Sequence, residues 1–208
     1  GYILNGTKCF ITNAPIADKI TLFANTREGG GIRGLTVFLV DADTKGISIG
    51  KEEDKMGIRA SATAEIIFED CFVPDSARVG KEGRGFMIAM QTLQMSRPVV
   101  AAISVGIAQA AIEAAVAYSH HRKQFGVKIA TFEMVQQMIA DMVMKTEAAR
   151  ILTYKACVAQ MNKDKKAGLY SAMSKCFASD TAMEVTTTAV QVMGGNGYSR
   201  ENPVEKYA

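Results

Sequence analysis

Residues 10–13 read Phe-Ile-Thr-Asn at the end of a strand-like segment. An aromatic ring beside a hydroxyl suits a planar heterocycle, because the ring can stack while Thr12 bonds a ring nitrogen or carbonyl. The alternative is that Phe10 lies in the core and Thr12 is merely exposed. Physical chemistry alone favours this alternative.

A second candidate is Arg122-Lys123-Gln124-Phe125-Gly126 at the end of a long helical pattern. An Arg grips a phosphate or pyrophosphate through two parallel hydrogen bonds, and Gln124 and Phe125 stand beside it. The alternative is structural, since a basic pair at a helix C-terminus complements the helix dipole.

The third candidate is the run Gly194-Gly195-Asn196-Gly197-Tyr198. Glycine leaves no side chain in the way, so a ligand can approach the backbone closely. The structural alternative is a helix C-cap followed by a turn. No strand precedes the run, which excludes a Rossmann-type nucleotide site here.

Composition narrows the class of protein. The chain has 208 residues, of which 48% are apolar and 22% charged, with a net charge of +3. These values exclude wholesale disorder and give no basis for nucleic-acid binding. No apolar run is expected to reach the roughly 20 residues of a membrane helix, so we expect no membrane partner.

The four cysteines are far apart and lack zinc spacing, so we assign no metal site. We expect Cys9, Cys71, Cys157 and Cys176 to be reduced core thiols of an intracellular protein. The chain opens within a strand pattern and stops where a helix begins, so we expect a fragment of a longer chain.

The first 80 residues predict short antiparallel strands. Residues 2–5 and 7–12 are expected to form a hairpin around Asn5-Gly6. Further strands are expected at residues 20–24, 35–40, 47–49 and 64–68, separated by turns and a flexible loop at 29–31. This pattern is typical of a barrel or sandwich.

From about residue 86 the apolar period becomes helical. Helices are expected over residues 86–121, with a kink or break at Pro98, from about residue 132 to 146, and from 173 until Gly194-Gly195. We therefore predict an α+β multidomain fold: an antiparallel β-barrel at residues 1–82, then an antiparallel four-helix bundle at 83–208.

Six segments in register resemble the acyl-CoA dehydrogenase family, near its medium- and short-chain members. The matching stretches are residues 5–13, 56–61, 68–74, 96–102, 122–126 and 191–198. The resemblance covers essentially the whole chain, without the family's N-terminal helical domain and the end of its bundle. It implies the middle β-barrel and C-terminal bundle of an FAD enzyme that forms homo-oligomers, usually tetramers.

The resemblance also implies the cofactor residues. Phe10, Ile11 and Thr12 would lie along the flavin ring. Arg122, Gln124 and Phe125, with Gln191, Val192, Met193, Gly194 and Gly195, would hold the FAD of a neighbouring subunit. Phe132 would sit near its adenine end, followed by Glu133 where relatives usually carry Gln.

The implied reaction is α,β-dehydrogenation of an acyl-CoA, with electrons passed to electron-transfer flavoprotein. The thioester arm would be faced by Gln94 and Arg97, although many relatives have Asp at the position of Gln94. The 3′-phosphate of the CoA would lie near Lys165 and Lys166, unless these two residues are simply a solvated pair. In most relatives the base is a Glu shortly beyond the last of these residues, and Ser96 stands where a minority place it. We leave Asp54, Glu82, Glu113 and Glu205 unassigned, so we predict no catalytic base among these residues.

Two other functions remain open. One is a flavin monooxygenase or acyl-CoA oxidase on the same scaffold, and the other a non-enzymatic helical interaction protein. The resemblance implies a cytoplasmic protein if the source is bacterial and a mitochondrial matrix protein if it is eukaryotic.

Overall fold

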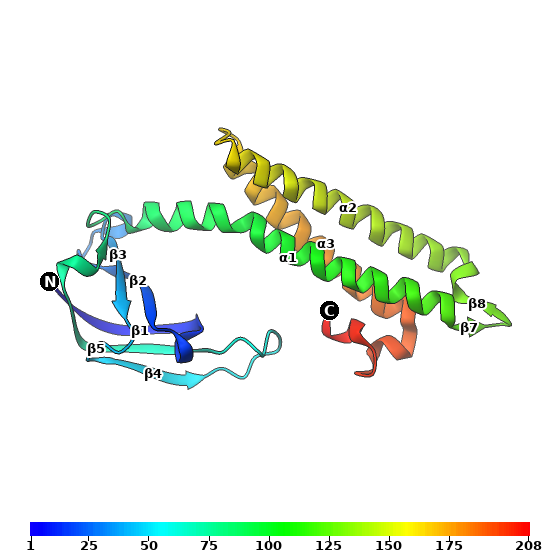
Figure 1. Ribbon diagram of the computed structural model, residues 1–208, viewed down its shortest axis with the longest axis horizontal. Helices are drawn as coiled ribbons and strands as arrows, with labels where there is room; N and C mark the ends of the chain where they lie inside the picture. Colours follow the sequence, from blue (N-terminus) through cyan, green and yellow to red (C-terminus); the bar gives the residue numbers. More distant parts are fainter. The chain divides into compact units, whose positions relative to one another are not determined.

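The computed structural model describes residues 1–208, which form two compact units, Gly1–Gln91 and Thr92–Ala208 (Figure 1). The division falls inside helix α1 (Gly85–His121), which therefore belongs to both units. A domain boundary at 82/83 stays a prediction. Each unit is described by itself.

The first unit contains two three-stranded antiparallel sheets. One has the order β1 (Tyr2–Thr12), β5 (Thr63–Val73), β4 (Ile47–Glu52), and the other the order β2 (Lys19–Asn25), β3 (Leu35–Asp41), β6 (Arg78–Val79). Short 3₁₀ helices occur in the connections at Ala14–Ile16, Gly31–Arg33 and Asp75–Ala77. No hydrogen-bonded ladder joins the sheets, so they form two layers and not the closed barrel that the sequence predicted.

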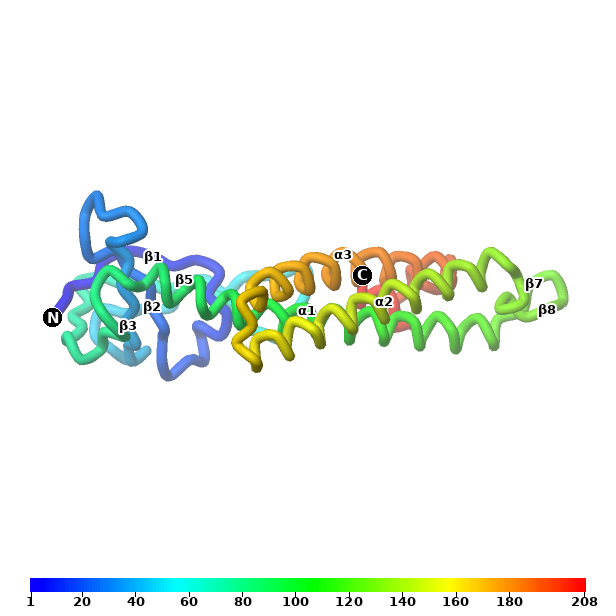
Figure 2. Tube along the Cα trace, turned by 90° about the horizontal axis from the view of Figure 1, so that it is seen from above, coloured from blue at the N-terminus to red at the C-terminus, as the bar shows by residue number.

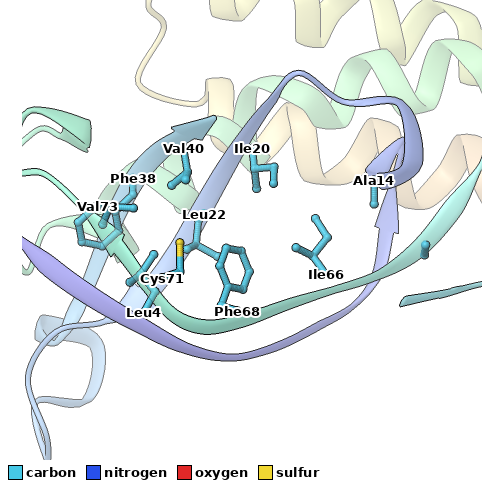
Figure 3. Packing of buried hydrophobic residues seen from close by; sticks show 11 residues of the cluster. Leu4, Ala14, Ile20, Leu22, Phe38, Val40, Ile66, Phe68, Cys71 and Val73 are labelled. Carbon is cyan, nitrogen blue, oxygen red and sulfur yellow. The ribbon is translucent and has the colours of Figure 1, made fainter. Parts of the chain in front are cut away.

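The alternating apolar residues of both sheets share one core (Figure 3). Ile20 and Leu22 from β2 and Phe38 from β3 are buried with Ile66 and Phe68 from β5. Side chains on one face of a strand recur every second residue, and this period makes each strand half-buried. The sequence-based strands at 20–24, 35–40, 47–49 and 64–68 all lie within observed strands.

The predicted hairpin at Asn5-Gly6 is wrong, because β1 continues through both residues. Its pairing with β5 shifts register between Leu4 and Gly6, and Gly6 has a φ of 138°. The glycine therefore serves a β-bulge, which needs the same backbone freedom as a turn. Asn5 then bonds across to β5, with its side-chain oxygen 2.8 Å from the Asp70 amide.

The second unit is built from α1, α2 (Glu133–Met161) and α3 (Ala167–Met193), which run side by side (Figure 2). A two-stranded ribbon, β7 (Lys123–Gln124) and β8 (Val127–Lys128), joins α1 to a 3₁₀ turn at Ile129–Thr131 and then to α2. Two further 3₁₀ helices, Gly194–Tyr198 and Pro203–Lys206, follow α3. The chain thus supplies three long helices, and the predicted four-helix bundle is not formed by these residues.

Small residues form the face of α1 that packs against α3. Ala108, Ala111 and Ala115 of α1 are buried against Val185 and Ala189 of α3 in one apolar cluster. These alanines recur at spacings of three and four residues, which places them along one face of α1.

The predicted kink or break at Pro98 does not end the helix, since α1 runs unbroken from Gly85 to His121. Proline has no N–H, so the carbonyl of Gln94 loses its usual helical donor. The side chain of Gln160 on α2 replaces that donor, with its Nε2 2.8 Å from the Gln94 oxygen. The backbone group freed by Pro98 is therefore satisfied from a neighbouring helix.

Helix α1 is long and apolar enough to cross a membrane, judged by length and composition alone. The expectation that no apolar run reaches the length of a membrane helix was therefore wrong. A single helix of this kind is weak evidence, because a core helix of a water-soluble protein passes the same test. The Ala-rich face of α1 packs against α2 and α3, and 33% of its most apolar segment is buried in the single chain.

The expectation of four core thiols holds only for Cys71, which is buried between the sheets. Cys9, Cys157 and Cys176 are exposed in this chain, and all four are free thiols. Cys9 and Cys176 each lie 3.8 Å from a carboxylate oxygen, of Glu65 and Asp180 respectively.

Candidate functional site

Two of the three sequence candidates meet in one hollow of the second unit, although they are about 70 residues apart. Arg122 and Gln124 line it from one side, and Gln191 to Asn196 from the other. Tyr118 and Ile129 complete the wall, and the volume is about 430 Å³. The sequence had selected Arg122, Gln124 and the glycine run, but not Tyr118.

The hollow lies where two helices end. Helix α1 ends at His121, so Arg122 follows directly, and its amide still bonds the Tyr118 carbonyl at 2.9 Å. Helix α3 ends at Met193, and Gly194 caps it by donating its amide to the Gln191 carbonyl. The structural reading of the glycines as a C-cap is thus correct, and it places them beside Arg122.

The glycine turn leaves its backbone open. Gly194 has a φ of 59° and a ψ of −138°, a region that is essentially restricted to glycine. A Cβ added at Gly194 or Gly195 would meet nothing within 4 Å. By contrast, Val192 and Met193 also line the hollow but are buried in the apolar core.

Arg122 is the only charged residue that lines the hollow. Three carbonyls near the end of α1 already accept a hydrogen bond: that of Ala117 from His121 Nδ1, that of Tyr118 from the Arg122 amide, and that of Arg122 from the Ile129 amide. The side chains of Arg122, Gln124 and Gln191 make no hydrogen bond or ion pair within the chain. This arrangement favours an anionic ligand.

Phe125 lies at the tip of the β7–β8 ribbon, and its side chain is 92% exposed. Phe125 and Gly126 have φ values of 53° and 82°, as in the tight turns that Asn-Gly usually forms. The Phe125 ring meets Phe132 edge to face, with 6.3 Å between centroids. An exposed aromatic ring on a strained backbone is typical of a functional contact.

Phe132 directly precedes α2. Glu133, which stands where relatives usually carry Gln, lies in the first turn of that helix. A carboxylate there complements the positive end of the helix dipole. The structural reading of Glu133 therefore explains its charge without a ligand.

In the first unit, Phe10 is not the core residue that physical chemistry alone favoured. The pairing of β1 with β5 shifts register between Lys8 and Ile11, and Phe10 has a φ of 56°. This bulge turns the ring outward, so that it is 72% exposed, and Thr12 is exposed nearby. Ile11 is half-buried and pairs with Ala64.

Gln94 and Arg97 lie three residues apart on α1, and both are half-buried. The Gln94 amide lies so close to the start of α3 that a Cβ at Gly168 would be 2.5 Å from its Nε2. Ser96 bonds the Leu93 carbonyl at 3.1 Å. Lys165 and Lys166 are exposed between α2 and α3, which fits a solvated pair.

Sequence reasoning missed a basic hollow of about 460 Å³ in the first unit. Arg27, Arg33 and Arg84 line it, and none of these guanidinium groups makes an ion pair or hydrogen bond within the chain. The one acid on the wall, Glu82, accepts a hydrogen bond from Tyr2 and lies 4.0 Å from Arg78. These three arginines follow no motif or regular spacing in the sequence. They come together because the loop at residues 26–34 packs against the start of α1.

No group of three or more His, Cys, Asp or Glu side chains is close enough to hold a metal ion. The carboxylates left unassigned as bases are scattered: Glu82 is bonded as above, and Glu113 accepts a hydrogen bond from Gln109 on its own helix.

Two family models match the chain: the acyl-CoA dehydrogenase middle domain at residues 1–71, and the acyl-CoA dehydrogenase C-terminal domain at residues 83–208. A probable acyl-CoA dehydrogenase of Mycobacterium tuberculosis is 48% identical over 99% of this chain and 53% of its own length. The chain thus spans about half the length of the relatives it matches.

Three solved structures show the same fold. Butyryl-CoA dehydrogenase from Megasphaera elsdenii has a TM-score of 0.96 at 47% identity, over 99% of this chain and 54% of that one. A structure described as the electron transferring flavoprotein of Acidaminococcus fermentans has a TM-score of 0.95 at 51% identity, with the same coverage. PigA with FAD and proline has a TM-score of 0.95 at 34% identity, over 100% and 54%.

Proposed function

Because the chain belongs to the acyl-CoA dehydrogenase family, we propose that the protein carrying it oxidises an acyl-CoA thioester to the trans-2-enoyl-CoA with FAD as cofactor. The observation that carries this proposal is the hollow that unites Arg122 and Gln124 with the glycine turn. The FAD named with PigA, at 34% identity, supports the choice of cofactor.

The residues of the hollow fit a dinucleotide. Arg122 offers a planar fork of donors to a diphosphate, and Gln124 and Gln191 offer amides that have no other partner. The backbone of Gly194 and Gly195 lets the ligand approach closely. Phe125 and Phe132 offer an aromatic surface to the adenine end.

In the first unit, Phe10 and Thr12 are proposed to meet the flavin ring, the exposed phenyl ring by contact and the hydroxyl by a hydrogen bond. FAD, when bound, supplies the acceptor for the hydride that leaves the β-carbon. The protein residues hold and orient it, which requires positions fixed by the strands and helices beneath them.

The anionic end of the substrate is proposed to bind at the basic hollow of Arg27, Arg33 and Arg84. The substrate carries phosphates, and guanidinium groups with no acidic partner are suited to them. Gln94 and Arg97 are proposed to face the thioester arm. Since Ser96 cannot act as a base and stands where a minority of relatives place one, the base that removes the α-proton is proposed to lie elsewhere in the intact polypeptide.

The electron acceptor is proposed to be electron-transfer flavoprotein, which the Acidaminococcus structure supports at 51% identity. A homo-oligomer, as a tetramer, is proposed because large apolar side chains of α1, such as Val99 and Ile103, remain exposed in the single chain. We further propose a cytoplasmic location in a bacterium, or the mitochondrial matrix in a eukaryote.

The test uses the intact polypeptide that contains these 208 residues. The purified protein is expected to be yellow, and acyl-CoA is expected to bleach its flavin absorbance without oxygen. Reoxidation by oxygen is expected to be slow, since rapid reoxidation would indicate an oxidase or a monooxygenase. A colourless protein that takes up no added FAD would refute the proposal.

A further inference from the structure

We infer that Tyr118 is an additional contact of the FAD hollow, and that its hydroxyl donates a hydrogen bond to a phosphate oxygen of the ligand. This inference rests on the proposed function, because it concerns the same hollow. It begins from the one hydrogen bond between side chains on the wall, from Asn196 Nδ2 to the Tyr118 oxygen at 2.6 Å.

The direction of that bond decides what Tyr118 can do. An amide nitrogen has only hydrogens to give, so Asn196 is the donor and the phenol oxygen is the acceptor. The phenol hydrogen is then left without a partner within the chain, next to the open hollow. Tyr118 thus adds one more donor beside the unpaired guanidinium of Arg122.

The position of Tyr118 on α1 directs it to the same ligand as Arg122. The two residues are four apart and therefore share one face at the end of the helix. The Tyr118 ring is packed against the apolar core below, so the hydroxyl is held rigidly. A rigid phenol loses little conformational freedom when it binds a ligand.

Tyr118 also positions the glycine turn. Glycine residues cannot fix a backbone by themselves, because they restrict φ and ψ least. Asn196 anchors this turn on both sides, since its side chain bonds Tyr118 and its carbonyl accepts from Asn202 Nδ2 at 2.9 Å. The bond to Tyr118 ties the open backbone of Gly194 and Gly195 to the helix that carries Arg122.

The test compares Tyr118→Phe with Tyr198→Phe in the intact polypeptide. Both changes remove one phenol oxygen. Tyr198 belongs to the same 3₁₀ turn as Asn196, but it makes no hydrogen bond within the chain and lines a different hollow. The Kd for FAD is measured by titration of the apoprotein, and the Tm of each apoprotein by calorimetry.

Tyr118→Phe is expected to raise the Kd for FAD roughly tenfold or more, as for loss of a hydrogen bond to a charged group. The apoprotein Tm is expected to stay within about 2 °C, and Tyr198→Phe to leave both values unchanged. Asn196→Ala is expected to weaken FAD binding less, because it loosens the turn but keeps the phenol donor.

An unchanged Kd in Tyr118→Phe would overturn the inference while the proposed function stands, because the wild-type protein still binds FAD. A raised Kd with a matching fall in the apoprotein Tm would also overturn it, by assigning Tyr118 a packing role only. A wild-type protein that binds no FAD would instead overturn the proposed function itself.

Discussion

Gly195→Ala separates a ligand-binding role for the glycine turn from a folding role. Gly195 does not have a positive φ, and an added Cβ would meet nothing within 4 Å. Alanine therefore fits the free chain without strain, and it removes conformational freedom from the unfolded state. The free energy of unfolding is expected to rise by about 0.4–1 kcal/mol, which raises the apoprotein Tm by roughly 1–4 °C.

The effect on FAD binding is expected to have the opposite sign. If the ligand touches the backbone at Gly195, the new methyl group occupies its place, and such overpacking costs about 1–3 kcal/mol. This corresponds to a rise in Kd of roughly 5- to 150-fold. Gly194 is unsuitable for this test, because its backbone conformation would strain any other residue.

Gly57→Ala provides the matched control. Gly57 lies in an exposed loop of the first unit, does not have a positive φ, and its added Cβ also meets nothing. It is expected to gain about 0.4–1 kcal/mol of stability and to bind FAD as the wild type does. If Gly195→Ala keeps its stability and binds FAD within twofold of the wild type, no ligand approaches this turn.

Three other changes test separate parts of the structure. Gln160→Met leaves the Gln94 carbonyl without a donor, and the expected loss of about 1–3 kcal/mol would be seen by denaturant unfolding; an unchanged midpoint contradicts the account of Pro98. The double variant Arg33→Ala/Arg84→Ala is expected to raise the KM for acyl-CoA roughly tenfold. The KM for the acyl-pantetheine analogue, which lacks the nucleotide phosphates, is expected to stay unchanged. Equal effects on both substrates would exclude a phosphate site. Burial raises the pKa of the Cys71 thiol, so the folded state holds this proton more tightly. The stability that this protonated thiol contributes is present below the ordinary thiol pKa and is lost as the pH rises through the raised pKa. The Tm of Cys71→Ala is therefore expected to fall less at alkaline pH than that of the wild type. Identical curves of Tm against pH for the two proteins would refute this expectation.

Sequence patterns predicted most of the secondary structure, because burial imposes a continuous apolar run of strand length in β3 and a helical period in α2 and α3. They failed where tertiary contacts decide the outcome. Asn5-Gly6 satisfies a bulge as well as a turn, and the donor from Gln160 that keeps α1 intact at Pro98 is 62 positions away. Local sequence cannot show either contact.

The candidate site was predicted mainly from the resemblance, and physical chemistry alone left each motif open. For Phe10 the favoured alternative was wrong, because the bulge that exposes the ring depends on the register against β5. The two arginines Arg33 and Arg84 of the basic hollow could not have been paired from sequence, since about 50 residues separate them. Tyr118 was missed because a tyrosine one turn before a helix end has no signature of its own.

The electrostatics of the hollow proposed for FAD differ from those of most phosphate sites. Such sites commonly use a helix N-terminus, where the dipole is positive. Here α1 and α3 both end at the hollow, and each contributes the negative end of its dipole. Because no acidic residue lines the hollow, the unpaired charge of Arg122 sets the sign of the local potential. Affinity for an anion therefore depends on side-chain donors and not on helix dipoles, which is why the loss of a single donor should be measurable.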